Sequence, residues 1–143
     1  MTFEFLIFTY SRPSYFNPFK MKIALIGYGK MGKAIEEIAL SKGHEVVLKI
    51  NRANQDEFTP ENLSKADVAI EFTGPHSAVE NLEKLFDAGI PVVSGSTGWL
   101  ERWEAVKRYC GSKQGGFIYA SNFSIGVNLF FELNMYLAKL MSD

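Results

Sequence analysis

The segment Gly27-Tyr28-Gly29-Lys30-Met31-Gly32 constrains the fold of this chain more than any other stretch. It follows the apolar run Ile23-Ala24-Leu25-Ile26, which is typical of a buried parallel strand. In the residues after it, apolar side chains recur at spacings of three and four, as in an amphipathic helix. A G-x-G-x-x-G loop between a strand and a helix is the phosphate-binding turn of a βαβ unit that binds a dinucleotide. The sequence therefore predicts such a unit from residue 21 onward.

Each glycine of this loop has a predicted role. Gly27 allows a tight turn, Gly29 lets the backbone approach a pyrophosphate, and Gly32 lets the helix pack closely on the sheet. The N-terminus of the helix offers free N–H groups and a partial positive charge to the phosphates. Lys30 adds a charge at the phosphates or is simply solvated. The alternative is a glycine-rich turn without a ligand.

Short apolar runs alternate with amphipathic stretches along the rest of the chain, which predicts an α/β fold built from βαβ units on a parallel sheet. Residues 51–66 are polar, so we expect a loop with at most one helical turn, after Thr59-Pro60. Residues 111–116 are expected to form a turn. The predicted strands are 23–26, 45–50, 67–72, 90–93 and 117–120, and the predicted helices are 31–42, 76–88, 99–109 and 127–141.

The composition is that of one folded domain, with 47% apolar and 22% charged residues in 143. Fifteen Lys and Arg nearly balance 16 Asp and Glu, so no basic field favours nucleic acid or an anionic membrane. Cys110 is the only cysteine, which excludes an internal disulfide and a multi-thiolate metal site. We expect no metal and a reducing, cytoplasmic compartment.

Residues 1–20 differ from the rest, since they contain seven Phe or Tyr residues, two prolines and no Gly or Ala. The apolar run 5–10 is far shorter than the roughly 20 residues that cross a bilayer. Glu4 and the sequence Ser11-Arg12-Pro13 do not fit a signal peptide. We therefore expect an atypical N-terminal extension, with the native start at Met21.

The second predicted strand ends in Lys49-Ile50-Asn51-Arg52. A dinucleotide-binding unit normally carries an acidic residue here, which accepts hydrogen bonds from the adenosine ribose. In its place Asn51 can bond a ribose hydroxyl, and Arg52 can pair with a 2′-phosphate. This favours NADPH, or use of both NADPH and NADH, over strict use of NADH. The alternative for Arg52 is an exposed loop arginine.

Three loops, 72–75, 95–98 and 120–123, follow the third, fourth and fifth strands. Because parallel strands end at one edge of a sheet, we expect these loops to line a cleft together with the glycine loop. Their small residues let backbone groups reach a nicotinamide amide and a polar substrate. Phe72 or Phe123 can pack on a ring, or fill the core. Asp67 and Glu71 lie four residues apart on the third strand, so their side chains point to the same face of the sheet. Neither is assigned as a general acid, since capping of the strand ends explains them as well.

Four blocks of this chain resemble dihydrodipicolinate reductase in order and spacing: residues 27–32, 67–75, 95–98 and 121–128. The last is the specific one, because Asn-Phe-Ser-x-Gly-Val-Asn is characteristic of that family. The resemblance spans Met21 to about Asp143. It implies a Rossmann-type, doubly wound, mostly parallel sheet and an NAD(P)H-dependent reductase of diaminopimelate and lysine synthesis. Such an enzyme converts 4-hydroxy-tetrahydrodipicolinate to tetrahydrodipicolinate in the cytoplasm.

The resemblance also implies which residues hold the cofactor. The glycine loop holds the pyrophosphate, residues 51–52 face the adenosine ribose, and residues 95–97 and 120–123 position the nicotinamide, with Thr97 near the substrate. The predicted cofactor-binding residues are Gly27, Tyr28, Gly29, Lys30, Met31, Gly32, Asn51, Arg52, Phe72, Gly95, Ser96, Thr97, Ala120, Ser121, Asn122 and Phe123.

Two departures from the family limit what the resemblance implies. Ser96 stands where the family usually has Thr. The family's His-His-x-x-Lys segment and its Ser-Gly-Thr carboxylate clamp, both in a second domain that also forms the homotetramer, do not occur here. His44 and His76 are the only histidines, and no catalytic residue is predicted. The expected division is an extension (1–20), a dinucleotide-binding domain (21–128) and a helix (129–143) leading toward the missing domain.

Three hypotheses for function remain. The first is the cofactor-binding part of a dihydrodipicolinate reductase, inactive alone. The second is a non-catalytic NAD(P)-sensing module that uses helix 127–141 as a partner interface. The third is another amino-acid dehydrogenase of the aspartate or homoserine type, which shares the glycine loop but does not explain Asn122 to Asn128.

Overall fold

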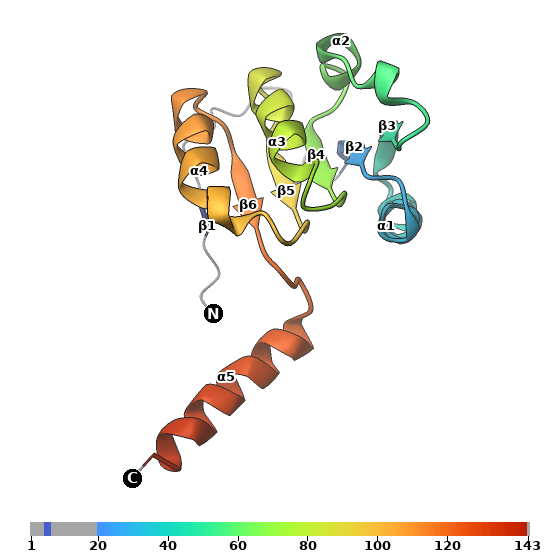
Figure 1. The fold of residues 1–143 in the computed structure, drawn as a ribbon. Coiled ribbons are helices and arrows are strands. Elements are labelled where there is room, and N and C mark those ends of the chain that lie inside the picture. The colour runs from blue at the N-terminus through green and yellow to red at the C-terminus, as the bar shows by residue number, and fades with distance from the viewer. Residues whose placement is uncertain (1–4, 7–19, 143) are drawn as a thin grey trace.

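A computed structural model describes residues 5–6 and 20–142 of the chain, and its centre is a parallel sheet. Neighbouring strands follow the order β1-β6-β5-β4-β2-β3 (Figure 1). All pairings from β6 to β3 are parallel, and β1 pairs with β6 antiparallel. The strands are β1 (Phe5–Leu6), β2 (Lys22–Ile26), β3 (Glu45–Ile50), β4 (Val68–Glu71), β5 (Val92–Ser94) and β6 (Phe117–Tyr119). The predicted α/β fold with a mostly parallel, doubly wound sheet is confirmed.

Helices connect the parallel strands, as βαβ units require. Thr59 caps α2, since its Oγ1 accepts a hydrogen bond from the N–H of Asn62 at 3.3 Å. Ser124 caps α5 in the same way, so this helix begins before Val127, the predicted start. The helices are α1 (Lys30–Ser41), α2 (Pro60–Leu63), α3 (Ala78–Asp87), α4 (Trp103–Ser112) and α5 (Ile125–Leu140), with 3-10 turns η1 (Gln55–Glu57) and η2 (Leu100–Arg102).

Two predictions about the loops are wrong. Residues 51–66 contain a second helical turn, η1, because side chains of Asn54 and its neighbours hydrogen-bond the local backbone. The turn predicted at 111–116 starts later, since α4 continues through Gly111 to Ser112. Gln114, with φ of 53°, takes the left-handed conformation that reverses the chain there. The helix therefore continues past Gly111, and the turn forms at residues 113–114.

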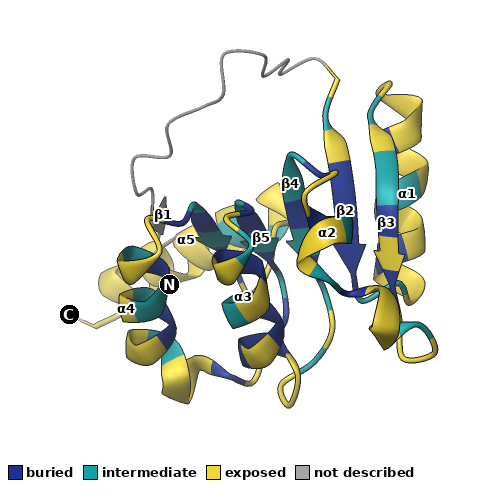
Figure 2. Ribbon diagram, turned by 90° about the horizontal axis from the view of Figure 1, so that it is seen from above, coloured by how far each residue is buried: buried dark blue, intermediate teal, exposed yellow. Residues whose placement is uncertain are grey.

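The core lies on both faces of the sheet. Ile23 and Leu25 of β2 pack with Ala39 of α1 on one face. Alternate residues Ala24 and Ile26 face the opposite side, which α2, α3 and α4 cover with the larger buried cluster. In Figure 2 the buried residues are concentrated in the strands and on the inward sides of α3 and α4. The alternation follows from the two-residue period of a strand.

Helix α5 leaves the sheet and extends away from it (Figure 1). None of its described residues is buried, although most are apolar. The predicted apolar positions Leu129, Phe130, Leu133, Tyr136, Leu137 and Leu140 are all exposed, by 51–65%. In the described part of the chain, no helix has both the length and the apolar content to cross a membrane.

The core can be tested at Leu82 of α3, which is fully buried. Leu82→Ala should lower the free energy of unfolding by about 2–5 kcal/mol, because it removes buried methyl groups and leaves a cavity. Leu100→Ala is the matched control, since Leu100 is 45% exposed, and it should change stability by less than about 0.5 kcal/mol. Urea denaturation followed by circular dichroism measures both; equal losses would contradict the assigned core.

Candidate nucleotide-binding site

Gly27 makes the turn that ends β2. Its N–H and that of Tyr28 both donate to the Ile50 carbonyl, at 2.9 and 2.8 Å, which ties the loop to the end of β3. Gly27 has φ of 98°, and a Cβ placed on it would lie 2.1 Å from the carbonyl oxygen of Phe72. Only glycine fits a backbone this close to β4 with this conformation. The predicted tight turn is confirmed.

The other two glycines differ in what surrounds them. A Cβ on Gly32 would lie 2.8 Å from the carbonyl oxygen of Gly27, so close packing at the start of α1 requires glycine. A Cβ on Gly29 would meet nothing within 4 Å, so the space in front of this residue is open. No side chain caps α1 and its first turn contains no acidic residue. The first N–H groups of a helix have no intrahelical partner, so this terminus is suited to an anion.

An open pocket of about 710 Å³ lies beside this helix terminus. Three segments that are distant in sequence surround it: the glycine loop, the loop after β3 and the loop after β4. They meet because β2 is the neighbour of both β3 and β4, and all three strands end at the same edge. The lining residues are Gly27, Tyr28, Gly29, Ile50, Asn51, Arg52, Ala53, Gln55, Phe72, Thr73, Gly74, Pro75, His76, Ser77 and Asn81.

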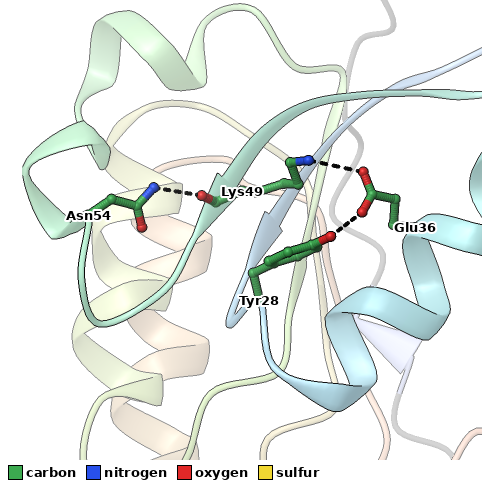
Figure 3. A network of polar contacts seen from close by, with 4 residues as sticks. All are labelled: Tyr28, Glu36, Lys49 and Asn54. Atoms are coloured by element: carbon green, nitrogen blue, oxygen red, sulfur yellow. Dashed lines mark hydrogen bonds and ion pairs between the residues drawn. The ribbon is translucent and has the colours of Figure 1, made fainter.

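Tyr28 lines the pocket. Two charged side chains, Glu36 and Lys49, contact it (Figure 3). Its hydroxyl donates to Glu36 of α1, and Lys49 Nζ lies 3.2 Å from the other carboxylate oxygen. Lys49 Nζ is also 5.2 Å from the centre of the Tyr28 ring. The hydrogen bond to Glu36 raises the pKa of the Tyr28 hydroxyl, and the same bond lowers the pKa of Glu36.

The loop after β3 is shaped by its own side chains. Asn51 Oδ1 accepts from the N–H of Ala53 at 2.7 Å, and Asn54 Nδ2 donates to the carbonyl of Lys49 at 2.8 Å. Asn51 Oδ1 is thus engaged within the loop, and Nδ2 is the group it can offer a ribose. Arg52 is exposed in the pocket lining, and among the described residues it has no ion pair. Its charge is therefore available to an anion.

Phe72 connects the pocket to two residues of the predicted nicotinamide region. It is half-buried and lies in the lining. A Cβ on Gly95 would lie 2.2 Å from the Phe72 ring, so Gly95 lets the ring lie against the backbone. The ring of Phe123 lies 6.4 Å from that of Phe72, centre to centre. Loops after β4, β5 and β6 therefore meet around one aromatic ring.

Ser96 points inward rather than into the pocket. Its hydroxyl donates to Glu71 at 2.7 Å and accepts from the N–H of Thr73 at 2.8 Å. Its carbonyl accepts from the indole of Trp99 at 2.7 Å. Glu71 thus joins the loops after β4 and β5. The other acidic residue, Asp67, accepts a hydrogen bond from the N–H of Lys22 at 2.7 Å, at the start of β2. The interpretation of both acidic residues as strand-end caps is confirmed.

The block 121–128 builds the start of α5. Asn122 Oδ1 accepts from the N–H of Ser124 at 2.8 Å, which forms a local turn. Asn128 Nδ2 donates to the carbonyls of Asn122 and Ser124, at 3.1 and 2.8 Å. Together with the Ser124 cap, these bonds define the turn from which α5 begins. The side chains of Asn122, Ser124 and Asn128 thus form hydrogen bonds with the backbone of this segment.

The pocket gathers only part of the predicted cofactor-binding set. Those in its lining are Gly27, Tyr28, Gly29, Asn51, Arg52 and Phe72. Those outside it are Lys30, Met31, Gly32, Gly95, Ser96, Thr97, Ala120, Ser121, Asn122 and Phe123. Lining residues absent from that set are Ile50, Ala53, Gln55, Thr73, Gly74, Pro75, His76, Ser77 and Asn81. Loop 72–75 was expected at the cleft, whereas Asn81 lies inside α3, where no sequence signal marks it.

The parallel sheet, the glycine turn and the uncapped helix beside a pocket define a Rossmann-type dinucleotide-binding domain. The chain matches the family model described as "Dihydrodipicolinate reductase, N-terminus" over residues 21–123. The chain therefore belongs to the dihydrodipicolinate reductase family, and the resemblance expected from its sequence is confirmed.

Curated relatives agree with this assignment. The chain is 46% identical over 123 residues to 4-hydroxy-tetrahydrodipicolinate reductase of Christiangramia forsetii, an alignment that covers 85% of this chain and 50% of the relative. It is 32% identical over 108 residues to the enzyme of the same name from Neisseria gonorrhoeae, covering 76% and 39%. The chain thus spans half or less of the length of these relatives.

Solved structures with a similar fold include homoserine dehydrogenases. A hyperthermophilic archaeal homoserine dehydrogenase in complex with NADPH matches with a TM-score of 0.55 at 17% identity, over 70% of this chain and 43% of that one. A putative homoserine dehydrogenase from Archaeoglobus fulgidus matches with a TM-score of 0.56 at 16% identity, over 69% and 42%. At these identities the likeness concerns the fold alone.

The glycine loop can be tested by two matched substitutions. Gly27→Ala should lower the free energy of unfolding by about 2 kcal/mol or more, since it combines a left-handed φ with a clash at the Phe72 carbonyl. Gly29→Ala should change stability by less than about 1 kcal/mol, because its φ is −98° and the space is open. Urea denaturation measures both, and equal losses would contradict this geometry.

Proposed function

We propose that this chain is the NAD(P)H-binding part of a 4-hydroxy-tetrahydrodipicolinate reductase that acts in lysine and diaminopimelate synthesis. The observation that carries the proposal is the open, uncapped helix terminus at Gly29, which faces a pocket of about 710 Å³. An anion fits there, because backbone N–H groups and the helix dipole favour negative charge. Family membership supports the reaction.

The residues present fit a dinucleotide along the edge of the sheet. Gly27 to Gly32 would hold the pyrophosphate, and Asn51 and Arg52 would hold the adenosine ribose. Residues 95–97 and 120–123 would hold the nicotinamide, and Gly95 and Phe123 of these segments both lie against the Phe72 ring. When bound, the reduced nicotinamide supplies a hydride. This chain's own residues bind and orient the donor.

Arg52 makes NADPH the preferred cofactor, with NADH also accepted. It is exposed, it lines the pocket, and no described carboxylate pairs with it. Lys49, near the end of β3, is paired with Glu36, so its charge is already neutralised. A 2′-phosphate on the ribose would therefore pair with the guanidinium of Arg52, and bidentate guanidinium–phosphate pairs are strong.

The remaining parts of the reaction are proposed to come from outside residues 21–143. Neither histidine matches the family's His-His-x-x-Lys segment: His44 Nδ1 accepts from the N–H of Met21 at 3.2 Å, and His76 is exposed. We therefore expect this chain alone to bind the cofactor and to reduce no substrate. Substrate binding and homotetramer formation belong to the second half of the family's sequence, and the proposed location is the cytoplasm.

Cofactor preference tests the proposed function. Isothermal titration of NADPH and NADH into this chain should give saturable binding of both, with NADPH at least about tenfold tighter. Arg52→Gln should weaken NADPH about tenfold and leave NADH within about twofold, because only NADPH carries the 2′-phosphate. Arg108→Gln is a control, since Arg108 is exposed on α4, away from the pocket lining. Absence of binding to the folded chain would refute the proposal.

The pyrophosphate position makes a separate prediction. Gly29→Ala should weaken NADPH and NADH equally, by about tenfold or more, because a Cβ would occupy the open space where the phosphates approach. The substitution is expected to leave the fold intact, so the loss can be assigned to binding. Unchanged affinity for both cofactors would place the pyrophosphate elsewhere.

A further inference from the structure

Glu71 is a carboxylate with no exposed surface, at the end of the central strand β4. One of its oxygens accepts from the N–H of Thr73 at 3.0 Å, from the Thr73 hydroxyl and from the Ser96 hydroxyl at 2.7 Å. The other accepts from the Ser94 hydroxyl at 2.6 Å. Among the described residues no cation pairs with it. Hydrogen bonds therefore compensate for burying this side chain.

The donors come from two different strand ends. Thr73 belongs to the loop after β4 and lines the pocket. Ser94 ends β5, and Ser96 lies in the loop after that strand. Ser96 also accepts from the N–H of Thr73 at 2.8 Å, and Asn81 Nδ2 donates to the Thr73 hydroxyl at 3.2 Å. One carboxylate thus fixes the distance between two loops at the carboxyl edge of the sheet.

The adenosine side of the pocket has a separate support. Tyr28, Glu36 and Lys49 hold that wall, and the side chains of Asn51 and Asn54 shape its loop. No hydrogen bond links these residues to Glu71 in the described part of the chain. A change at Glu71 should therefore disturb loops 72–75 and 95–98 and leave the adenosine side in place.

We propose that Glu71 is a positioning residue for the nicotinamide half of the cofactor, which acts by holding Thr73 and Ser96. It touches no ligand itself, because it is fully buried. The inference rests on the proposed function, since it assumes that a nicotinamide dinucleotide occupies the pocket. It adds that the two halves of the cofactor depend on two separate hydrogen-bond networks.

The test compares two ligands on two variants by isothermal titration. Glu71→Leu removes the acceptors, and it should weaken NADPH about tenfold while adenosine 2′,5′-bisphosphate, which lacks the nicotinamide, changes by less than about twofold. Glu71→Gln preserves the shape and an acceptor oxygen toward Thr73 and Ser96, and the Ser94 hydroxyl can turn to accept from the amide. It should keep NADPH within about threefold of the unsubstituted chain.

Thermal unfolding of each variant, followed by circular dichroism, verifies the fold. If Glu71→Leu does not fold, Ser96→Ala takes its place, and it should weaken NADPH alone, by about threefold. An equal loss of both ligands, no loss of NADPH, or failure of Glu71→Gln to restore affinity would each overturn the positioning role. Failure of the unsubstituted chain to bind NADPH would instead refute the proposed function, so the two failures are distinguishable.

Discussion

The close approach of Gly27 to the carbonyl of Phe72 is the constraint on which the rest of the site depends. It sets the end of β2 directly against the end of β4, with no room for a side chain between them. The same turn bonds to the Ile50 carbonyl of β3. Three strand ends therefore meet at one point, and the loops that leave them surround the pocket. A larger residue at position 27 would separate the strands and displace all three loops.

Many polar side chains at this edge of the sheet form hydrogen bonds with other groups of the protein. Asn51, Ser96 and Asn122 look from the sequence like ligands for a nucleotide, yet each has a side-chain oxygen engaged in a hydrogen bond within the protein. Of the three, Ser96 is buried, so its hydroxyl needs such partners, because an unpaired buried group costs free energy. These residues shape the loops that present the backbone and Arg52.

Helix α5 differs from this polar edge of the sheet, because most of its exposed side chains are apolar. A helix that is hydrophobic all round is normally buried on several sides. The polar bonds of Asn122, Ser124 and Asn128 still give it a defined beginning. The block 121–128 thus builds the start of the helix that follows β6. The alignment with the Christiangramia relative covers 50% of that protein.

The sequence by itself determined the α/β class, the strand positions and the turn at Gly27, because two-residue and helical periodicities and glycine requirements are local properties. It also indicated Arg52 and Phe72 at the pocket. Only the tertiary structure decided that Asn81, inside α3, lines the pocket, and that Glu71 joins two loops. Both depend on which strand ends lie side by side, a long-range outcome of packing that no local pattern encodes.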